Sequence, residues 1–396
     1  MQTDDNVAGA SLSFDMPTTE FGDGSRAVLP DILDRYNIKS PLVVTDEGVE
    51  DAGVLDDVLK FVSTDVTRHY ATTEPSTRDF DDIPSTDFDC VIAVGGGSVL
   101  DTAKVVALLL THGGDPASYL SVNNVPGPLC PLIAVPTTSG TGSQATQTAV
   151  ITNDGIKRGM SDEFLQPDVA IVDPELTFDL PRSVTARSGF DAFVHALESL
   201  TARDYRWVDD RAINYQGANP VSRAFSRRAL SCVWHSLERA VHDGDDREAR
   251  RTLSLGSHLA GAAFSNAGLG VVHAIASSVG GMVDVPHGDS LAVSVEPGLI
   301  YNLPNRHVQY AEIARWLDLA TTDEPDHDAA HALIDGCERL GESVGLTGSF
   351  EEVGLERNDI TALVENTLVQ KRRIKTTPRT PVADHLRAVL EESFEC

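Results

Sequence analysis

Short apolar stretches alternate with helical stretches through the first half of the chain. Four of them have the length and composition of buried strands: Pro41–Thr45, Phe88–Val94, Leu132–Val135 and Val169–Val172. Between the second and the third, Val99–Thr111 carries apolar residues at helical spacing. Apolar strands that alternate with helices predict a parallel α/β sheet.

The pattern changes near residue 180. Beyond this point apolar residues recur three or four positions apart, as in Phe193, Leu197 and Leu200, and no stretch has the features of a strand. The second half is therefore predicted to be helical, with a boundary between residues 178 and 182. The predicted domains are an α/β domain over residues 1–180 and an all-α domain over residues 181–396.

Length and apolar content bound the class of protein. A chain of 396 residues can form two domains, each with its own core. Its longest apolar run, Val105–Leu110, is too short to cross a membrane, and the acidic start at Met1–Gly9 is unlike a signal peptide. We therefore expect a cytoplasmic protein. The five cysteines include no C-x-x-C pair, which disfavours a disulfide framework and a thiolate zinc site.

The charge balance is strongly acidic. The chain has 60 acidic and 31 basic residues, a formal net charge of −29, and only six of the basic residues are lysines. Such a chain repels nucleic acid and anionic lipid, so neither is an expected partner. The carboxylates are spread along the whole chain, which is typical of the hydrated surfaces of proteins from salt-loving organisms.

A glycine-rich turn, Gly95-Gly96-Gly97-Ser98, joins the second strand to the following helix. Glycine lets the backbone approach a ligand, and the free N–H groups at a helix start attract an anion such as pyrophosphate. The turn lacks the G-x-G-x-x-G spacing, so a plain tight turn is an equal alternative. Asp46 ends the first strand, where a carboxylate can bind an adenosine ribose or simply cap a helix.

Four further residues are candidate metal ligands. Asp191 and His195 lie four positions apart in a helical stretch, which places both on one face. His273 and His287 follow in the same half of the chain. Nitrogen and oxygen ligands of this kind suit Fe²⁺ or Zn²⁺ better than Ca²⁺ or Mg²⁺. Each histidine alone is more commonly a packed or surface residue.

Four motifs, in this order and spacing, resemble the iron-containing alcohol dehydrogenases: GGGSVLDTAK, PTTSGTGSQAT, DAFVHALES and HAIASSVGGMVDVPHG. The resemblance covers about residues 40 to 300. It implies a Rossmann-like α/β domain followed by an all-α domain, the layout of dehydroquinate synthase, and a homodimer. It also implies hydride transfer between an alcohol and a nicotinamide cofactor, with a metal ion that acts as a Lewis acid on the substrate oxygen.

The resemblance also assigns residues. In that family a D-x-x-x-H helix and two later histidines fourteen residues apart hold the metal, which matches Asp191, His195, His273 and His287, and no catalytic residue beyond these ligands is implied. Fe²⁺ is expected, with Zn²⁺ as the alternative. The carboxylate of Asp46 favours NAD over NADP. The implied cofactor contacts are Asp46, Gly96, Gly97, Ser98, Asp101, Thr137, Thr138, Thr141, Ser143 and Lys157.

The sequence departs from the family pattern at one residue and in two short segments. Ser277 stands where many members have a second histidine that is implicated in proton relay, so the proton must leave another way, through water or the cofactor ribose. Gly142-Ser143-Gln144 replaces the usual G-S-E, and Glu74-Pro75-Ser76 replaces the usual N-P-T.

Other functions stay open at this point. Tyr215–Pro220 resembles an insertion of hydroxyacid–oxoacid transhydrogenases, a branch of the same family that uses 4-hydroxybutyrate as hydride donor. A lyase of the dehydroquinate synthase type would need Lys or Arg near the metal to bind a phosphorylated substrate, and residues 190–200 and 270–290 contain neither. A non-catalytic metal- or nucleotide-binding protein would not need both sets of motifs.

The net charge of −29 predicts that folding and activity need salt. Crowded carboxylates repel one another and destabilise the compact state. Molar salt shortens the screening length to about 3 Å and removes most of that repulsion. The melting temperature and the initial rate should both rise from low to molar KCl. Values that stay flat or fall with added KCl would contradict a halophilic protein.

Overall fold

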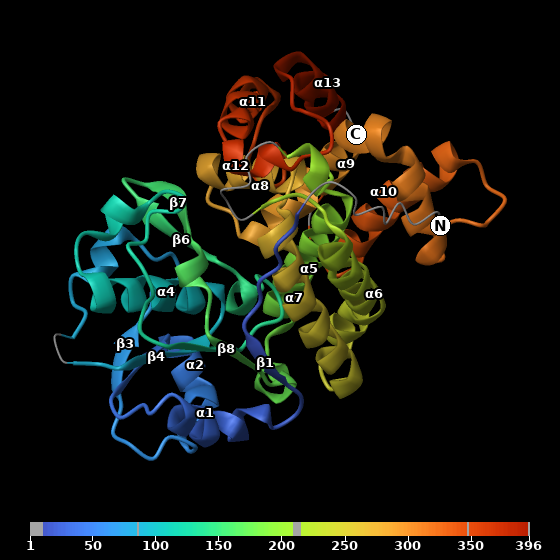
Figure 1. Ribbon diagram of the computed structural model, residues 1–396. Helices are drawn as coiled ribbons and strands as arrows, with labels where there is room; N and C mark the ends of the chain where they lie inside the picture. Colours follow the sequence, from blue (N-terminus) through green and yellow to red (C-terminus); the bar gives the residue numbers. More distant parts are fainter. Residues whose placement is uncertain (1–10, 85–86, 209–214, 347, 395–396) are drawn as a thin grey trace.

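The computed structural model describes residues 11–84, 87–208, 215–346 and 348–394. An α/β half and a helical half lie side by side, and the strands of the α/β half come before the long helices in the chain (Figure 1). The predicted fold class, a parallel sheet domain followed by an all-α domain, is confirmed. Within the described ranges, the last named strand ends at Val172 and the first long helix, α5, begins at Arg182.

Six parallel strands form the sheet, in the order β1-β8-β5-β4-β2-β3. The four strands predicted from apolar runs are β2, β4, β5 and β8, and they occupy the middle of the sheet. The edge strands β1 and β3 were not predicted, because most of their residues are half-buried or exposed and form no apolar run. The strands are β1 (Thr18–Phe21), β2 (Pro41–Thr45), β3 (Thr67–Tyr70), β4 (Cys90–Gly95), β5 (Leu132–Pro136) and β8 (Val169–Val172).

Helices cover both faces of this sheet. Alternate residues of β2 belong to different cores, with Val43 in one and Leu42 and Val44 in the other, and all three are fully buried. Burial on both faces explains why the central strands are apolar throughout. The helices are α1 (Leu29–Arg35), α2 (Glu47–Asp51), α3 (Val54–Leu59) and α4 (Gly97–His112), and an antiparallel hairpin of β6 (Thr148–Asn153) and β7 (Ile156–Ser161) stands outside the sheet.

The strand order fixes where a ligand can bind. From β2 the chain passes outward to β3 and then returns to β4 on the other side of β2. In doubly wound sheets, ligands bind at such a switch point, beyond the carboxyl ends of the two strands. Asp46 follows β2 directly, and Gly96 follows β4 directly. The topology therefore brings the two predicted cofactor motifs to one edge.

The helical half packs around α5 (Arg182–Thr201), whose middle is almost completely buried. Among the described residues, no single helix is long and apolar enough to cross a membrane, and α7 with α8 passes that test only as a pair bent by 100°. The other helices are α6 (Pro220–His242), α7 (Arg247–Ala267), α8 (Val271–Met282), α9 (His287–Trp316), α10 (Asp326–Ser343), α11 (Ile360–Leu368), α12 (Lys371–Lys375) and α13 (Ala383–Ser393).

The loop after β5 joins the two halves through very close backbone contacts. A Cβ atom built on Gly142, whose φ is +65°, would lie 2.5 Å from the Cα of Gly261 on α7. One built on Gly140 would lie 2.5 Å from the Cβ of Ser188 on α5. Only glycine permits these approaches. The loop therefore lies directly against the two helices, and the edge of the sheet is held next to the helical half.

Candidate metal and cofactor site

Helix α5 presents three ionisable side chains on one face. Asp191, His195 and Glu198 lie at positions i, i+4 and i+7, and each is no more than 5% exposed. A run of two acids and a histidine inside a buried helix is costly unless each side chain has a polar partner. The partners come from α8 and from the first residue of α9.

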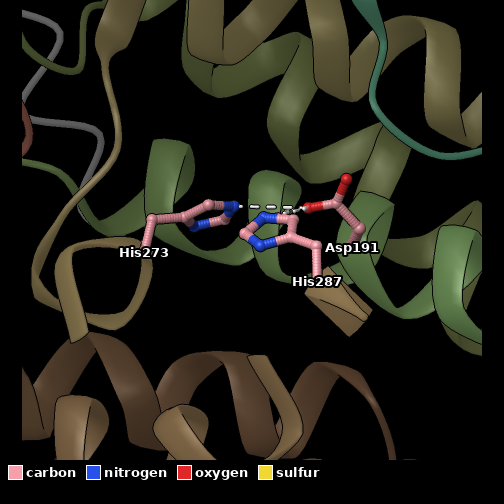
Figure 2. Close-up of side chains that lie close together, drawn as sticks. All are labelled: Asp191, His273 and His287. Carbon is pink, nitrogen blue, oxygen red and sulfur yellow. Dashed lines mark hydrogen bonds and ion pairs between the residues drawn. The ribbon is translucent and has the colours of Figure 1, made fainter. Parts of the chain in front are cut away.

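The three histidine Nε2 atoms converge on one oxygen of Asp191. The Oδ1 atom of Asp191 lies 3.3 Å from Nε2 of His273, 3.4 Å from Nε2 of His195 and 3.8 Å from Nε2 of His287. Figure 2 shows Asp191, His273 and His287, whose donor atoms all lie within 4.8 Å of one another. The structure thus brings together all four residues predicted as metal ligands.

Burial and charge set the protonation states of these groups. Burial lowers the pKa of His195 to about 3, although Asp191 opposes the shift. The His195 ring is therefore neutral near pH 7, the form that binds a metal. Burial alone would raise the pKa of Asp191, but His195, His273 and His287 outweigh it and the pKa falls.

Glu198, which the sequence motifs did not single out, orients His273. Its Oε2 accepts from Nδ1 of His273 at 2.7 Å, and its Oε1 accepts from the backbone N–H of Val272 at 2.8 Å. A histidine that donates Nδ1–H to a carboxylate presents Nε2 as a free lone pair, which is the usual outer contact of a metal ligand. The i, i+4, i+7 spacing from Asp191 was the signal that could have identified it.

Ring contacts fix the opposite side of the cluster. His195 is stacked between Phe264, at 4.1 Å between ring centroids, and His273, at 4.6 Å. His287 differs from both, because its side chain is 47% exposed. The cluster is therefore closed by packing on the His195 side and open to solvent on the His287 side.

The glycine turn packs against the threonine-rich loop. A Cβ on Gly97 would lie 2.5 Å from Thr141, and one on Gly96 would lie 3.3 Å from Thr138. Helix α4 begins at Gly97 without any side-chain cap. Its first N–H groups are therefore available for an anion, as predicted for a pyrophosphate-binding turn.

A fully buried lysine ties this turn to the loop and the hairpin. Lys104 is 0% exposed and donates to Oγ of Ser143 at 2.8 Å, to Oγ1 of Thr146 at 2.9 Å and to the carbonyl of Thr148 at 2.7 Å. Ser143 in turn donates to Asp101 at 2.6 Å. Burial lowers the pKa of Lys104 to about 8. Asp101 and Ser143, both predicted as cofactor contacts, are thus joined in one hydrogen-bonded network.

The remaining predicted residues lie around this edge. Asp46 caps α2, since its Oδ1 accepts from the N–H of Val49 at 2.8 Å. Thr137 donates its N–H to the carbonyl of Gly95 at 3.0 Å. Lys157, on β7, pairs with Glu74 at 2.6 Å, and both side chains are more than half exposed.

Helix α12 carries two adjacent arginines. Arg372 lies over the ring of Tyr215, at 4.2 Å from its centroid, and donates to Oγ1 of Thr148 at 2.7 Å, and Arg373 donates to Gln370 at 2.9 Å. The motif stretches around the metal ligands contain no Lys or Arg. Their absence counts against a lyase of the dehydroquinate synthase type but does not decide the question by itself.

Comparison with known families decides the assignment. A model of the family "Iron-containing alcohol dehydrogenase" matches residues 17–174, and a model described as "Fe-containing alcohol dehydrogenase family, C-terminal" matches residues 185–394. The chain belongs to the iron-containing alcohol dehydrogenase family. It is therefore an oxidoreductase, and the resemblance noted in the four motifs is confirmed.

Individual members of this family match between 78% and 97% of the chain. The NAD-dependent methanol dehydrogenase of Bacillus methanolicus is 31% identical over 389 residues, which are 96% of this chain and 98% of the relative. A mitochondrial hydroxyacid-oxoacid transhydrogenase of Xenopus laevis is 37% identical over 343 residues. The match covers 78% of this chain and 72% of the relative. A crystal structure of a 1,3-propanediol oxidoreductase superposes with a TM-score of 0.89 at 29% identity, and covers 97% of this chain and 100% of the other.

Replacing Glu198 by Gln should weaken metal binding in this alcohol dehydrogenase about 10- to 100-fold. An amide cannot accept every hydrogen bond that the two carboxylate oxygens accept, so the His273 ring loses its fixed orientation. Competition with a coloured chelator measures the affinity. Glu296→Gln is the matched control, because Glu296 is a half-buried glutamate that accepts from Ser393 on α13. Equal metal affinity in wild type and Glu198→Gln would remove Glu198 from the site.

Proposed function

We propose that this protein is a metal-dependent, NAD-linked dehydrogenase that interconverts an alcohol and its aldehyde or ketone. The observation that carries the proposal is the convergence of three histidine Nε2 atoms on Oδ1 of Asp191, at 3.3 to 3.8 Å. These separations are longer than strong hydrogen bonds. Two ligands at tetrahedral angles around a metal, each about 2.0 to 2.1 Å from it, lie about 3.4 Å apart.

The charges of the ligand side chains also support a divalent metal at this site. Asp191 and Glu198 are buried carboxylates, whereas His195 is neutral near pH 7 because burial lowers its pKa. The donor set of one carboxylate and three imidazoles suits Fe²⁺ and Zn²⁺, and the family favours iron. The metal would be held by Asp191, His195, His273 and His287. When bound there, it supplies Lewis acidity to the alcohol or carbonyl oxygen.

The strand order and the bare start of α4 support the cofactor site. Gly96, Gly97 and Ser98 present backbone N–H groups at the switch point, where a pyrophosphate binds in doubly wound sheets. The cofactor supplies the acceptor for the hydride. Asp46 has one oxygen engaged in capping α2, and its other oxygen remains for the ribose. The side chains proposed to line the cofactor beyond the turn are Asp101, Thr137, Thr138, Thr141, Ser143 and Lys157.

The proton of the alcohol needs an exit. Ser277 on α8 has no basicity near neutral pH, and Lys157 is paired with Glu74 at 2.6 Å. The exposed side of His287 admits water to the ligand cluster. We therefore propose that water, or a cofactor ribose hydroxyl, takes the proton, and that no side chain beyond the metal ligands acts as the catalytic base.

The relatives leave the substrate open. Their names include a methanol dehydrogenase, which acts on a neutral alcohol, and a hydroxyacid-oxoacid transhydrogenase, which acts on acids. Transhydrogenation would use the same metal and cofactor sites, with a hydroxyacid in place of free NADH as the hydride source. A panel of alcohols, aldehydes and hydroxyacids with free NAD(H) distinguishes the two: turnover of free cofactor identifies a dehydrogenase.

Metal removal should abolish alcohol oxidation, and added Fe²⁺ or Zn²⁺ should restore it. His287→Ala should lower kcat/KM by more than about 100-fold, since loss of even an outer contact of a metal ligand costs 10- to 100-fold. Because the His287 side chain is 47% exposed, the melting temperature should change little. NADH absorbance and metal content are the measurements, and His327→Ala, at an exposed histidine on α10, is the control. Full turnover by metal-free His287→Ala protein would contradict the proposal.

Asp46 should make the enzyme prefer NAD(H). Asp46→Ser keeps a capping oxygen for α2 and removes the charge that opposes a 2′-phosphate, so the NADP-to-NAD ratio of kcat/KM should rise on the order of tenfold. Asp51→Ser, at the end of the same helix, removes an equal charge away from the switch point and should leave the ratio unchanged. A wild-type preference for NADP(H) would show that Asp46 does not face the ribose.

A further inference from the structure

His195, one of the proposed metal ligands, lacks the outer hydrogen bond that orients His273. Among the residues that the structure describes, Nδ1 of His195 is buried without a hydrogen-bond partner, whereas Nδ1 of His273 is bonded to Glu198 at 2.7 Å. A ligating histidine normally donates its second ring nitrogen to an oxygen, and that bond fixes the ring. The orientation of the His195 ring must therefore be set by other contacts.

Ring packing supplies those contacts. The His195 ring is stacked on Phe264, with 4.1 Å between the centroids and 17° between the planes, and on His273 at 4.6 Å. Phe264 lies near the end of α7 and is 6% exposed. A ring that is stacked on both neighbours can tilt only if one of them moves, and a closely packed interior resists that movement. Whatever holds Phe264 therefore also holds His195.

Tyr215 holds Phe264 from its edge. The two ring centroids lie 6.5 Å apart at an interplanar angle of 77°, and Tyr215 is 4% exposed. Its backbone is left-handed, with a φ of +67°, which is rare for a bulky side chain. The N–H groups of residues 215–217 donate to the carbonyls of residues 265–267, the last carbonyls of α7. These bonds keep the unfavourable conformation and place the ring against Phe264.

Arg372 holds Tyr215 and ties it to the α/β half. Its guanidinium carbon lies 4.2 Å from the centre of the Tyr215 ring, a cation–π contact. Its Nη2 donates to Oγ1 of Thr148 on β6 at 2.7 Å, and the carbonyl of Thr148 accepts from the buried Lys104 at 2.7 Å. The line of contacts that starts at His195 thus ends on the fixed hairpin.

We propose that Phe264, Tyr215 and Arg372 are positioning residues that hold the His195 ring in the orientation that binds the metal. This ring stack does for His195 what the Glu198 carboxylate does for His273. The proposal also gives a role to Tyr215, the first residue of the stretch Tyr215–Pro220, which the proposed metal and cofactor sites leave unused. The inference rests on the proposed metal site and adds the residues that orient one of its ligands.

The test measures the affinity for Co²⁺ and the geometry in which it is held. Affinity comes from competition with a coloured chelator, and geometry from the visible absorption bands of bound Co²⁺. Phe264→Leu and Tyr215→Leu should each weaken Co²⁺ binding about tenfold or more and shift these bands, because the His195 ring can then tilt. Tyr215→Phe keeps the ring and should match wild type in both measurements.

Phe193→Leu is the matched control for lost packing. Phe193 lies on the same helix as His195, is fully buried, and contacts the ring of Trp234 at 5.9 Å between centroids. This variant should lose melting temperature as Phe264→Leu does, because each removes one buried ring. It should keep the Co²⁺ affinity and the absorption bands of wild type.

Arg372→Gln tests the outer end of the stack. It should weaken Co²⁺ binding about two- to fivefold, the effect of losing one cation–π contact. Arg227→Gln is its control, because the guanidinium carbon of Arg227 lies 4.8 Å from the centre of the Trp316 ring. This control should leave Co²⁺ binding unchanged.

Wild-type Co²⁺ affinity and absorption bands in both Phe264→Leu and Tyr215→Leu would overturn the ring stack and leave the proposed dehydrogenase intact. Equal losses of Co²⁺ affinity in Phe193→Leu and Phe264→Leu would show general destabilisation, and the inference would be wrong. Weaker NADH binding by Arg372→Gln, with unchanged Co²⁺ affinity, would remove Arg372 from the stack. Failure of the wild-type protein to bind Co²⁺ would instead overturn the proposed metal site.

Discussion

The burial of one carboxylate governs the arrangement of the helical half. Asp191 is 3% exposed, and an unpaired buried carboxylate is costly enough to destabilise the fold by several kcal/mol. Its Oδ1 is surrounded by imidazole nitrogens from α5, α8 and α9. Three helices must therefore meet at one point. The apolar cores around α5, α8 and α9 hold that meeting point in place.

A second constraint brings the cofactor edge to this point. The loop after β5 touches α7 and α5 through Gly142 and Gly140, with almost no side chain between the backbones. Lys104 then ties the same loop to α4 and to the hairpin. Contacts within the protein thus hold the glycine turn and the threonine-rich loop next to the helical half. Preorganisation of this kind reduces the cost of bringing reacting groups together.

The sequence predicted what local patterns encode. Central strands are buried on both faces and are apolar throughout, so they were found, whereas the edge strand β3 exposes three of its four residues and was not. The four candidate ligands lie in distinctive motifs, and the structure places them together. Glu198 was overlooked because its meaning depends on His273, 75 residues away in the chain. Arg372 belongs to no local motif, and only tertiary packing brings it over the ring of Tyr215.

The contact between Gly142 and Gly261 has a consequence for protein engineering. Chimaeras that combine the α/β half of one family member with the helical half of another are an obvious way to pair a chosen cofactor preference with a chosen substrate. The backbones at this contact leave no room for a side chain on either partner. The loop and α7 therefore form one indivisible unit. A useful crossover must keep both segments from the same parent, even though they lie more than a hundred residues apart in the sequence.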